Sequence, residues 1–315
     1  MAYKKKLITL LSLIAALALT YTASIVFAPE AAGSRSASHV WLDPRLASRA
    51  VRIVIDSAGE SVELYKKNSQ WFVSSNGKEY PARQLRVEDF MGIFTKPALW
   101  PVRSSSASSH ERLGLTEETA SRITIYGENT ALLDLLLGSE DSTGREINVR
   151  SYAKNEVRSG DNKISSYITG SANSWFNFRL IPESEDGRIA VDSVQRLSVY
   201  SDGGTQIFSR KNRSWTVSGL DIVNPDQSGI DAYVRAVLNI EGDDFDDSVS
   251  GDDPALDHSR IVLELGNGSI KTIRFSGPDE SGRRLAHVSG ADYVYSLAPW
   301  AAAQLFRSAS DFERR

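Results

Sequence analysis

Residues 52–74 read RIVIDSAGESVELYKKNSQWFVS, and residues 196–218 read RLSVYSDGGTQIFSRKNRSWTVS. Each stretch begins with an Arg, continues with alternating apolar residues and reaches a Trp at the same offset, Trp71 in the first and Trp215 in the second. A period of two that is interrupted by turn-forming residues is typical of antiparallel strands joined by hairpins. Two such signals in one register predict that the chain holds two copies of one β-rich module.

Further matches follow in the same order along the chain. Residues 122–125, RITI, match residues 260–263, RIVL, and the Gly-bounded loop 138–145 matches the loop 277–283. The two copies are also predicted to close alike, because residues 177–179 resemble residues 311–314 and each group follows an apolar segment with a Trp, Trp175 and Trp300 respectively. We therefore place the two repeat modules at residues 49–186 and 190–315.

Each module also contains one segment with helical periodicity. Pro81 opens the first and the Asn224-Pro225 pair opens the second, as expected for prolines at a helix start. Apolar residues that fall on one helical face are Val87, Phe90, Met91 and Phe94 in the first and Ile230, Tyr233, Val234, Val237 and Leu238 in the second. The predicted fold class is α+β, with an antiparallel sheet and one or two covering helices in each module. Asn267-Gly268 predicts a type I′ hairpin turn, and Asn76-Gly77 is a second candidate.

The first residues predict a membrane segment. Lys4, Lys5 and Lys6 precede an uncharged stretch from Leu7 to Phe27, whose helical length of roughly 31 Å matches a bilayer. We expect a transmembrane anchor over residues 1–28 and favour it over a cleaved signal peptide, because the possible cleavage positions are poor. The lysines then predict a single-pass protein of the bacterial inner membrane, with its N-terminus in the cytoplasm and its body extracytoplasmic.

Residues 29–48 are rich in Ala, Ser, Gly and Pro and are expected to form a stalk. For the second half of this segment an alternative stays open. Val40, Trp41 and Leu42 could dock it on the first module as a loop.

The composition excludes several classes of function. The 315 residues include 36 Lys and Arg against 40 Asp and Glu, and the formal net charge of −4 supplies no broad positive field for nucleic acid. Cys is absent, so disulfides, thiolate nucleophiles and Cys-ligated zinc are excluded. We expect no nucleic-acid partner.

An acidic run in the second module is the one surface that invites a binding hypothesis. Its aspartates are Asp243, Asp244, Asp246 and Asp247. Several carboxylates together can bind calcium, but the glycine and the closing glutamate of an EF-hand loop are missing at the required spacing. A solvated loop is the preferred interpretation, weak cation binding or an electrostatic contact remain open, and the four aspartates form the candidate interaction surface.

Other possible sites have simpler structural explanations. Ser75 and Lys78 have the Ser-x-x-Lys spacing of some serine hydrolases, but they flank an Asn-Gly turn and the companion motifs are missing. The histidines, His39, His110, His258 and His287, lie far apart in the sequence and are expected at turns or on the surface. Trp71 and Trp215 are expected in the core, whereas Trp41 and Trp100 could be exposed.

The order of a strand, a strand with a Trp, a helix, a Leu-rich turn and a Gly-bounded hairpin resembles a bacterial family of unknown function, DUF4340. The resemblance covers nearly the whole chain after the first residues, although Tyr293-Val294-Tyr295 fits the family pattern and Glu156-Val157-Arg158 in the first copy does not. It implies an N-terminal anchor, repeated modules and a setting beside ABC-type transporters of the gliding-motility kind. It implies no reaction.

We expect a non-catalytic accessory or binding subunit, with no catalytic, cofactor or metal residues. Its expected partners are extracytoplasmic or membrane protein subunits, such as those of an ABC-type system, and the membrane itself through the N-terminal helix. A protein that binds envelope glycan or an exported ligand is the alternative. A hydrolase is a third hypothesis, which the lack of a coherent acid/base pair disfavours.

Overall fold

The computed structural model describes residues 14–17, 20, 38–168, 171–181, 189–220, 222 and 224–314. The chain divides into two compact units, unit 1 up to Phe176 and unit 2 from Asn177 onward. Antiparallel sheets account for most of the regular structure in both. The predicted α+β class is therefore wrong, and the fold is mainly β. The reason is that hairpins supply most of each unit, while the principal helix of each unit has only 12 residues.

Unit 1 is built on a nine-stranded sheet of order β5-β4-β3-β2-β8-β9-β10-β11-β7. The strands are β2 (Arg52–Ser57), β3 (Glu60–Lys67), β4 (Gln70–Ser75), β5 (Lys78–Pro81), β7 (Val102–Ser104), β8 (Ser121–Tyr126), β9 (Ala131–Glu140), β10 (Glu146–Ser151) and β11 (Val157–Asp161). A separate two-stranded sheet pairs β1 (Ser38–His39) with β6 (Ala98–Leu99).

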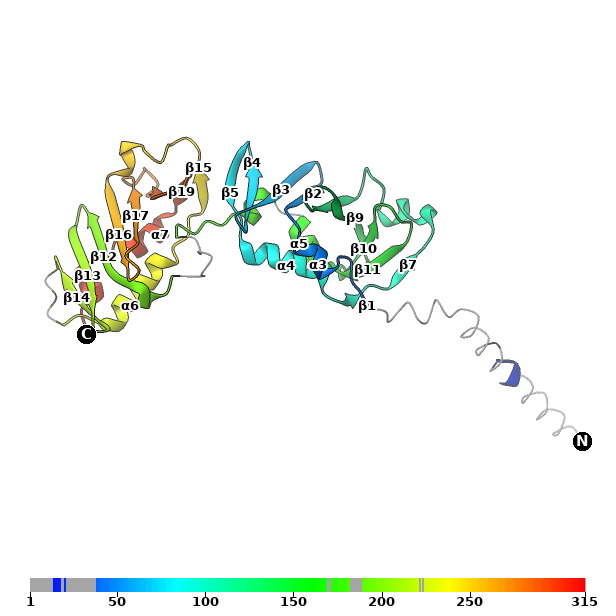
Figure 1. Ribbon diagram of the computed structural model, residues 1–315, viewed down its shortest axis with the longest axis horizontal. Helices are drawn as coiled ribbons and strands as arrows, with labels where there is room; N and C mark the ends of the chain where they lie inside the picture. Colours follow the sequence, from blue (N-terminus) through cyan, green and yellow to red (C-terminus); the bar gives the residue numbers. More distant parts are fainter. Residues whose placement is uncertain are drawn as a thin grey trace, which may run out of the picture. The chain divides into compact units, whose positions relative to one another are not determined.

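Unit 2 is built on an eight-stranded sheet of order β14-β13-β12-β16-β17-β18-β19-β15. The strands are β12 (Val194–Ser201), β13 (Gly204–Lys211), β14 (Ser214–Ser218), β15 (Asp244–Asp246), β16 (Ser259–Leu265), β17 (Ile270–Phe275), β18 (Arg284–Val288) and β19 (Val294–Leu297). Apart from β5, every strand of the unit 1 sheet has a counterpart at the same place and in the same chain order in unit 2 (Figure 1).

The principal helices are α4 (Gln84–Thr95) in unit 1 and α6 (Gln227–Leu238) in unit 2. Shorter helices are α3 (Pro44–Ala47), α5 (Ser165–Ile168), α7 (Pro299–Leu305), η1 (Ala107–Ser109), η2 (Glu111–Leu113), η3 (Asn162–Ile164), η4 (Ala172–Trp175), η5 (Val191–Ser193), η6 (Pro254–Leu256) and η7 (Ala309–Phe312). Pro81 does not open α4, as the sequence predicted, but ends β5. Val87, Phe90 and Phe94 of α4 are buried, as the apolar periodicity indicated.

The same side-chain clamp ties the principal helix to the Trp strand in both units. The amide of Gln84 accepts from the backbone N–H of Trp71 and donates to its carbonyl, with both distances 3.0 Å. Gln227 does the same for Trp215, at 2.7 and 3.0 Å. Each clamp satisfies two backbone groups at the strand edge. The prediction that Trp71 and Trp215 lie in the core is confirmed, because they are only 8% and 2% exposed.

One of the two Asn-Gly turns agrees with the prediction and the other does not. Asn76 and Gly77 both have positive φ, 52° and 75°, and join Ser75 directly to Lys78, as a type I′ turn requires. At Asn267-Gly268 only the glycine has positive φ, and the loop is longer because Glu264 pairs with Ile270. The second dipeptide is therefore not a type I′ hairpin turn.

The ends of the modules also need correction. Phe312 and Trp175 are structural counterparts, because each carbonyl accepts the backbone N–H of the residue before the principal helix, Asp226 at 2.8 Å and Arg83 at 2.8 Å. Phe178 is not the counterpart of Phe312, since it belongs to unit 2. Trp300 is 65% exposed on α7 and does not correspond to the fully buried Trp175.

The predicted anchor over residues 1–28 lies outside the described residues, except for residues 14–17 and 20. Among the residues that are described, no helix is long and apolar enough to span a membrane. The N-terminal transmembrane helix in the predicted fold and the single-pass inner-membrane location are accordingly not supported, and neither is carried further.

Residues 38–48, in the predicted stalk, form part of unit 1. The backbone N–H groups of Trp41 and Leu42 both donate to the carbonyl of Phe94 at 3.0 Å, and Leu42 is buried. The alternative that this segment docks on the first module as a loop is therefore confirmed. Trp100, for which the sequence left exposure open, is buried, and its ring packs edge-on against Trp41 at 5.4 Å.

Candidate functional site

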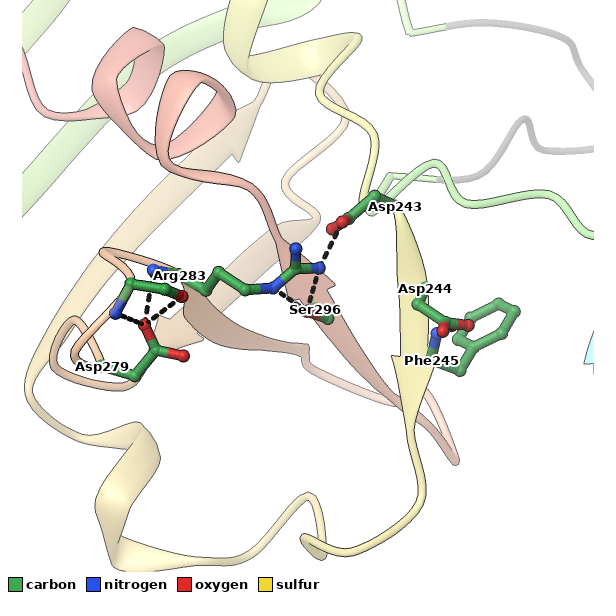
Figure 2. Close-up of polar contacts among 7 residues, drawn as sticks. Asp243, Asp244, Phe245, Asp279, Arg283 and Ser296 are labelled. Carbon is green, nitrogen blue, oxygen red and sulfur yellow. Dashed lines mark hydrogen bonds and ion pairs between the residues drawn. The ribbon is translucent and has the colours of Figure 1, made fainter.

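The predicted acidic surface lies on and beside β15, at one edge of the unit 2 sheet. Asp243 forms an ion pair with Arg283, whose guanidinium also donates to Ser296 Oγ at 2.9 Å (Figure 2). Arg283 follows a loop that Asp279 holds by accepting the Arg283 backbone N–H at 2.8 Å (Figure 2). Asp243 is therefore part of a local polar network.

The remaining aspartates do not converge on one point. Asp244 accepts the backbone N–H of Phe245, and Asp246 accepts from the N–H and hydroxyl of Ser248 at 2.8 and 2.5 Å. Asp247 is exposed. In the described part of the chain, no group of three or more His, Asp or Glu side chains is placed to hold a metal ion. The structure thus brings the four aspartates to one edge without forming a cation site.

A second polar site lies where the β12–β13 turn meets the start of β16. We call it the unit 2 cleft. It has a volume of about 490 Å³, and its polar lining includes Asp202, Gln206, His258, Ser259, Arg284 and Arg307. These residues come from the β12–β13 hairpin, β16, β18 and the segment after α7.

Two buried polar atoms on residues that line the cleft have no hydrogen-bond partner among the described residues. They are the hydroxyl of Ser259 and the side-chain carbonyl Oε1 of Gln206, and the two residues are only 4% and 6% exposed. The other end of the Gln206 amide is held, because Nε2 donates to the carbonyl of Arg307 at 2.9 Å. A buried acceptor that is left unsatisfied costs about 1–3 kcal/mol, so a partner that reached either atom would lower the free energy of the protein.

His258 and Asp202 are in contact at the rim of the cleft, with Nε2 and Oδ2 2.9 Å apart. The turn that carries Asp202 differs from its counterpart in unit 1. Ala58 and Gly59 both have positive φ, 52° and 84°, whereas among residues 202–204 only Gly204 does, at 102°. Asp202, whose carboxylate contacts His258, therefore lies in a turn with a different backbone conformation from that of unit 1.

Arg284 contributes a partly desolvated cation. Its guanidinium lies over the ring of Phe306 at 5.0 Å, and Nη1 donates to the carbonyl of Ser276 at 2.8 Å. Burial lowers the pKa of Arg284, and the carboxylate of Asp202 partly offsets that effect. Such a group gains more from a bound anion than a fully hydrated arginine does, because part of its water has already been removed.

The corresponding corner of unit 1 has a different character. The counterparts of Ser201 and Ser259 are Ser57 and Ser121, whose hydroxyls hydrogen-bond to each other at 2.8 Å. The counterpart of Gln206 is the buried Val62, since Ile55 pairs with Val62 as Val199 pairs with Gln206.

The counterpart of His258 is Ala120, which precedes Ser121 as His258 precedes Ser259. The polar atoms that have no hydrogen-bond partner in unit 2 are therefore either hydrogen-bonded or absent in unit 1.

Strand pairing shows that Arg284 replaces a buried apolar residue. In unit 1, Ser121 pairs with Leu137, and Leu137 pairs in turn with Val149 on the next strand. Ile147 lies two residues before Val149. In unit 2, Ser259 pairs with Phe275, and Phe275 pairs in turn with Ala286 on the next strand. Arg284 lies two residues before Ala286. Ile147, which is 2% exposed, thus occupies the place that Arg284 occupies in unit 2.

The residues of this cleft were not recognised as a site from the sequence. His258 was interpreted only as a surface or turn residue, and His287, also expected at a turn or on the surface, is instead buried in β18. The repeat register contained a usable signal, because it places Gln206 against Val62 and His258 against Ala120. Arg284 could not be found in this way, since the loop from Asp141 closes on Glu146 and the loop from Asp279 closes one residue earlier, on Arg283.

The comparisons with known proteins identify a family. None of the curated proteins compared with the chain matches it. The family described as "Domain of unknown function (DUF4340)" matches residues 71–257, which run from the Trp strand of unit 1 to the start of β16 in unit 2 and make up more than half of the chain. The chain therefore belongs to the DUF4340 family.

Proposed function

We propose that this protein is a non-catalytic binding protein that holds a small polar ligand in the unit 2 cleft. The observation that carries the proposal is the pair of buried, unpartnered atoms at the cleft, Ser259 Oγ and Gln206 Oε1. A ligand that hydrogen-bonds to both would remove their desolvation penalty. The apolar or closed counterparts in unit 1 support a specific role for these residues, because the same sheet folds without them.

The geometry favours binding over hydrolysis. His258 and Asp202 resemble the His-Asp half of a catalytic triad, but in the described residues no hydroxyl is hydrogen-bonded to His258. The imidazole ring packs beside Gly277, where an added Cβ would lie 3.7 Å from Nδ1 and 3.8 Å from Cε1 and Cγ. The His258–Asp202 pair is accordingly proposed to shape the rim of the binding site.

The proposal can be tested by NMR titration of the full chain with a panel of neutral, anionic and cationic small molecules. We expect at least one class to shift the signals of Ser259 and Gln206 in a saturable manner. The double variant Ser259→Ala, Gln206→Val should bind that class more weakly, whereas Ser121→Ala in unit 1 serves as the matched control. If no compound perturbs the cleft, or if the double variant binds as the natural protein does, the proposal is wrong.

A second candidate function is protein contact through β15. This strand is the edge of its sheet, and an edge strand can pair with another chain. Its aspartates would favour a basic partner, for which the family resemblance suggests a subunit of an ABC-type system. Charge reversal of Asp243, Asp244, Asp246 and Asp247 should reduce crosslinking to such a partner in cells. Unchanged crosslinking would remove this candidate.

A further inference from the structure

We infer that the ligand of the unit 2 cleft carries an anionic group, a carboxylate or a phosphate, beside a hydroxyl or amine that donates a hydrogen bond. The inference rests on the proposed function and assigns the chemical class of ligand to the same cleft. It depends on three side chains whose hydrogen-bonding capacities are different and complementary, Arg284, Gln206 and Ser259.

Arg284 selects for negative charge. A guanidinium has five N–H donors in a planar fork, and among the described residues only the bond to Ser276 uses one of them. The fork fits two oxygens of a carboxylate or phosphate at once. Arg307 adds a second cation to the lining, while Asp202 is the one carboxylate of the lining and is paired with His258. The formal count of guanidinium and carboxylate groups therefore leaves the cleft positive.

Gln206 selects for a donor on the ligand. Because its Nε2 donates to Arg307, the orientation of the amide is defined and Oε1 can only accept. Ser259 can either donate or accept. An anion without an O–H or N–H would satisfy Arg284 and leave Gln206 unpaired, and a neutral polyol would do the reverse. Hydroxy acids, amino acids and phosphorylated polyols satisfy both requirements.

Unit 1 provides an internal contrast in charge. The equivalent corner there is lined by Asp56, Glu60, Glu117 and Glu118 and has a volume of about 430 Å³. These carboxylates would repel an anion, and the apolar Ile147 stands where Arg284 stands in unit 2. An anionic ligand should therefore distinguish the two corners, whereas a neutral polyol has less reason to do so.

The experiment compares glycerol 3-phosphate, glycerate, glycerol and inorganic phosphate as probes in NMR titrations of the full chain. We expect glycerol 3-phosphate or glycerate, or both, to shift the signals of Ser259 and Gln206 and to bind more tightly than glycerol or phosphate. The two anionic probes also distinguish a phosphate from a carboxylate as the preferred group. No probe should shift Glu117 or Glu118.

Substitutions identify the residue responsible. Arg284→Gln should weaken binding of the preferred probe about 10-fold or more, as expected for loss of a charged hydrogen bond. Arg284→Lys, which keeps the charge but not the fork, should have an intermediate effect. The control is Arg260→Gln, because Arg260 is exposed and alternates to the face opposite Ser259 on β16. The amide spectrum reports whether each variant is folded.

The outcomes separate the two proposals. If glycerol binds at the cleft as tightly as the anionic probes, or if both Arg284 variants bind normally, the anionic class is wrong while a ligand-binding cleft stands. Inorganic phosphate carries an O–H of its own, so phosphate that binds as tightly as glycerol 3-phosphate overturns the requirement for a separate hydroxyl or amine beside the anionic group. If no probe of this panel or of the broader one perturbs the cleft, both proposals fail.

Discussion

Two equivalent corners of this molecule, one in each unit, have the same backbone framework and opposite chemistry. In unit 1 the positions equivalent to Gln206, His258 and Arg284 are occupied by the apolar residues Val62, Ala120 and Ile147. Strand order and the Gln–Trp clamp are the same in both units. The comparison teaches that the shared framework maintains the fold, and that a specific function is best sought where the two copies differ.

The largest expected effect comes from placing the unit 2 cation in unit 1. Ile147→Arg would bury a guanidinium without a partner at a site that is 2% exposed, and we expect the free energy of unfolding to fall by on the order of 3 kcal/mol. Urea unfolding of the full chain, followed by tryptophan fluorescence, measures the change. Glu146→Arg, at the exposed neighbouring position, is the control. An unchanged unfolding midpoint for Ile147→Arg would show that the two corners are interchangeable.

Converting the cleft toward unit 1 should stabilise the protein. Gln206→Val removes a buried acceptor that costs about 1–3 kcal/mol and loses one hydrogen bond worth about 1 kcal/mol, so we expect a net gain of about 1 kcal/mol. The reciprocal change Val62→Gln should destabilise unit 1 by about 1–3 kcal/mol. Differential scanning calorimetry of both variants tests the pair. A loss of stability in Gln206→Val would mean that its amide is satisfied in the ligand-free protein.

A smaller effect is expected at the edge of the unit 2 sheet. Arg283 and Asp243 are 39% and 37% exposed, and exposed ion pairs contribute less than about 1 kcal/mol. A double-mutant cycle with Asp243→Asn and Arg283→Gln should therefore give a small coupling energy that decreases as salt is added. A coupling energy well above 1 kcal/mol would show that this network is structurally more important than its exposure indicates.

The smallest effect concerns the Gly-bounded loop that both units share. The backbone N–H of Glu146 and the hydroxyl of Thr143 lower the pKa of Asp141 to about 2. The hydroxyl of Ser281 likewise lowers the pKa of Asp279. Since a folded-state pKa below the ordinary value of about 3.9 favours the ionised form, this stabilisation is present above about pH 4 and is lost as pH falls toward 2.

Carboxyl ¹³C NMR titration measures both pKa values directly. In unfolding experiments the difference in stability between the natural protein and Asp141→Asn should shrink between pH 4 and pH 2, and Asp279→Asn should behave in the same way. A difference that does not depend on pH would show that the loop is held by other contacts.

Sequence periodicity predicted the strands well because each runs for several residues with one buried face. The Trp71 and Trp215 registers, the two principal helices and the burial of both tryptophans were all visible in the amino-acid order. The ends of the modules were not, since Phe178 and Trp300 resemble their supposed counterparts locally, and only the backbone bonds to Asp226 and Arg83 show that Phe312 corresponds to Trp175. The prediction of a type I′ turn at Asn267 was wrong for a related reason, because the strand pairing, and not the Asn-Gly dipeptide, sets the length of the loop.

The sequence by itself determined the repeated strand pattern, the core tryptophans and the family, because these follow from local periodicity and from residues in a constant register. Only the tertiary structure decided which polar residues meet. Asp202, His258 and Arg284 are separated by long stretches of chain, and a different turn and a one-residue change in loop length bring them to one cleft. The difference arises because hydrogen-bond satisfaction depends on three-dimensional neighbours, which local patterns do not specify.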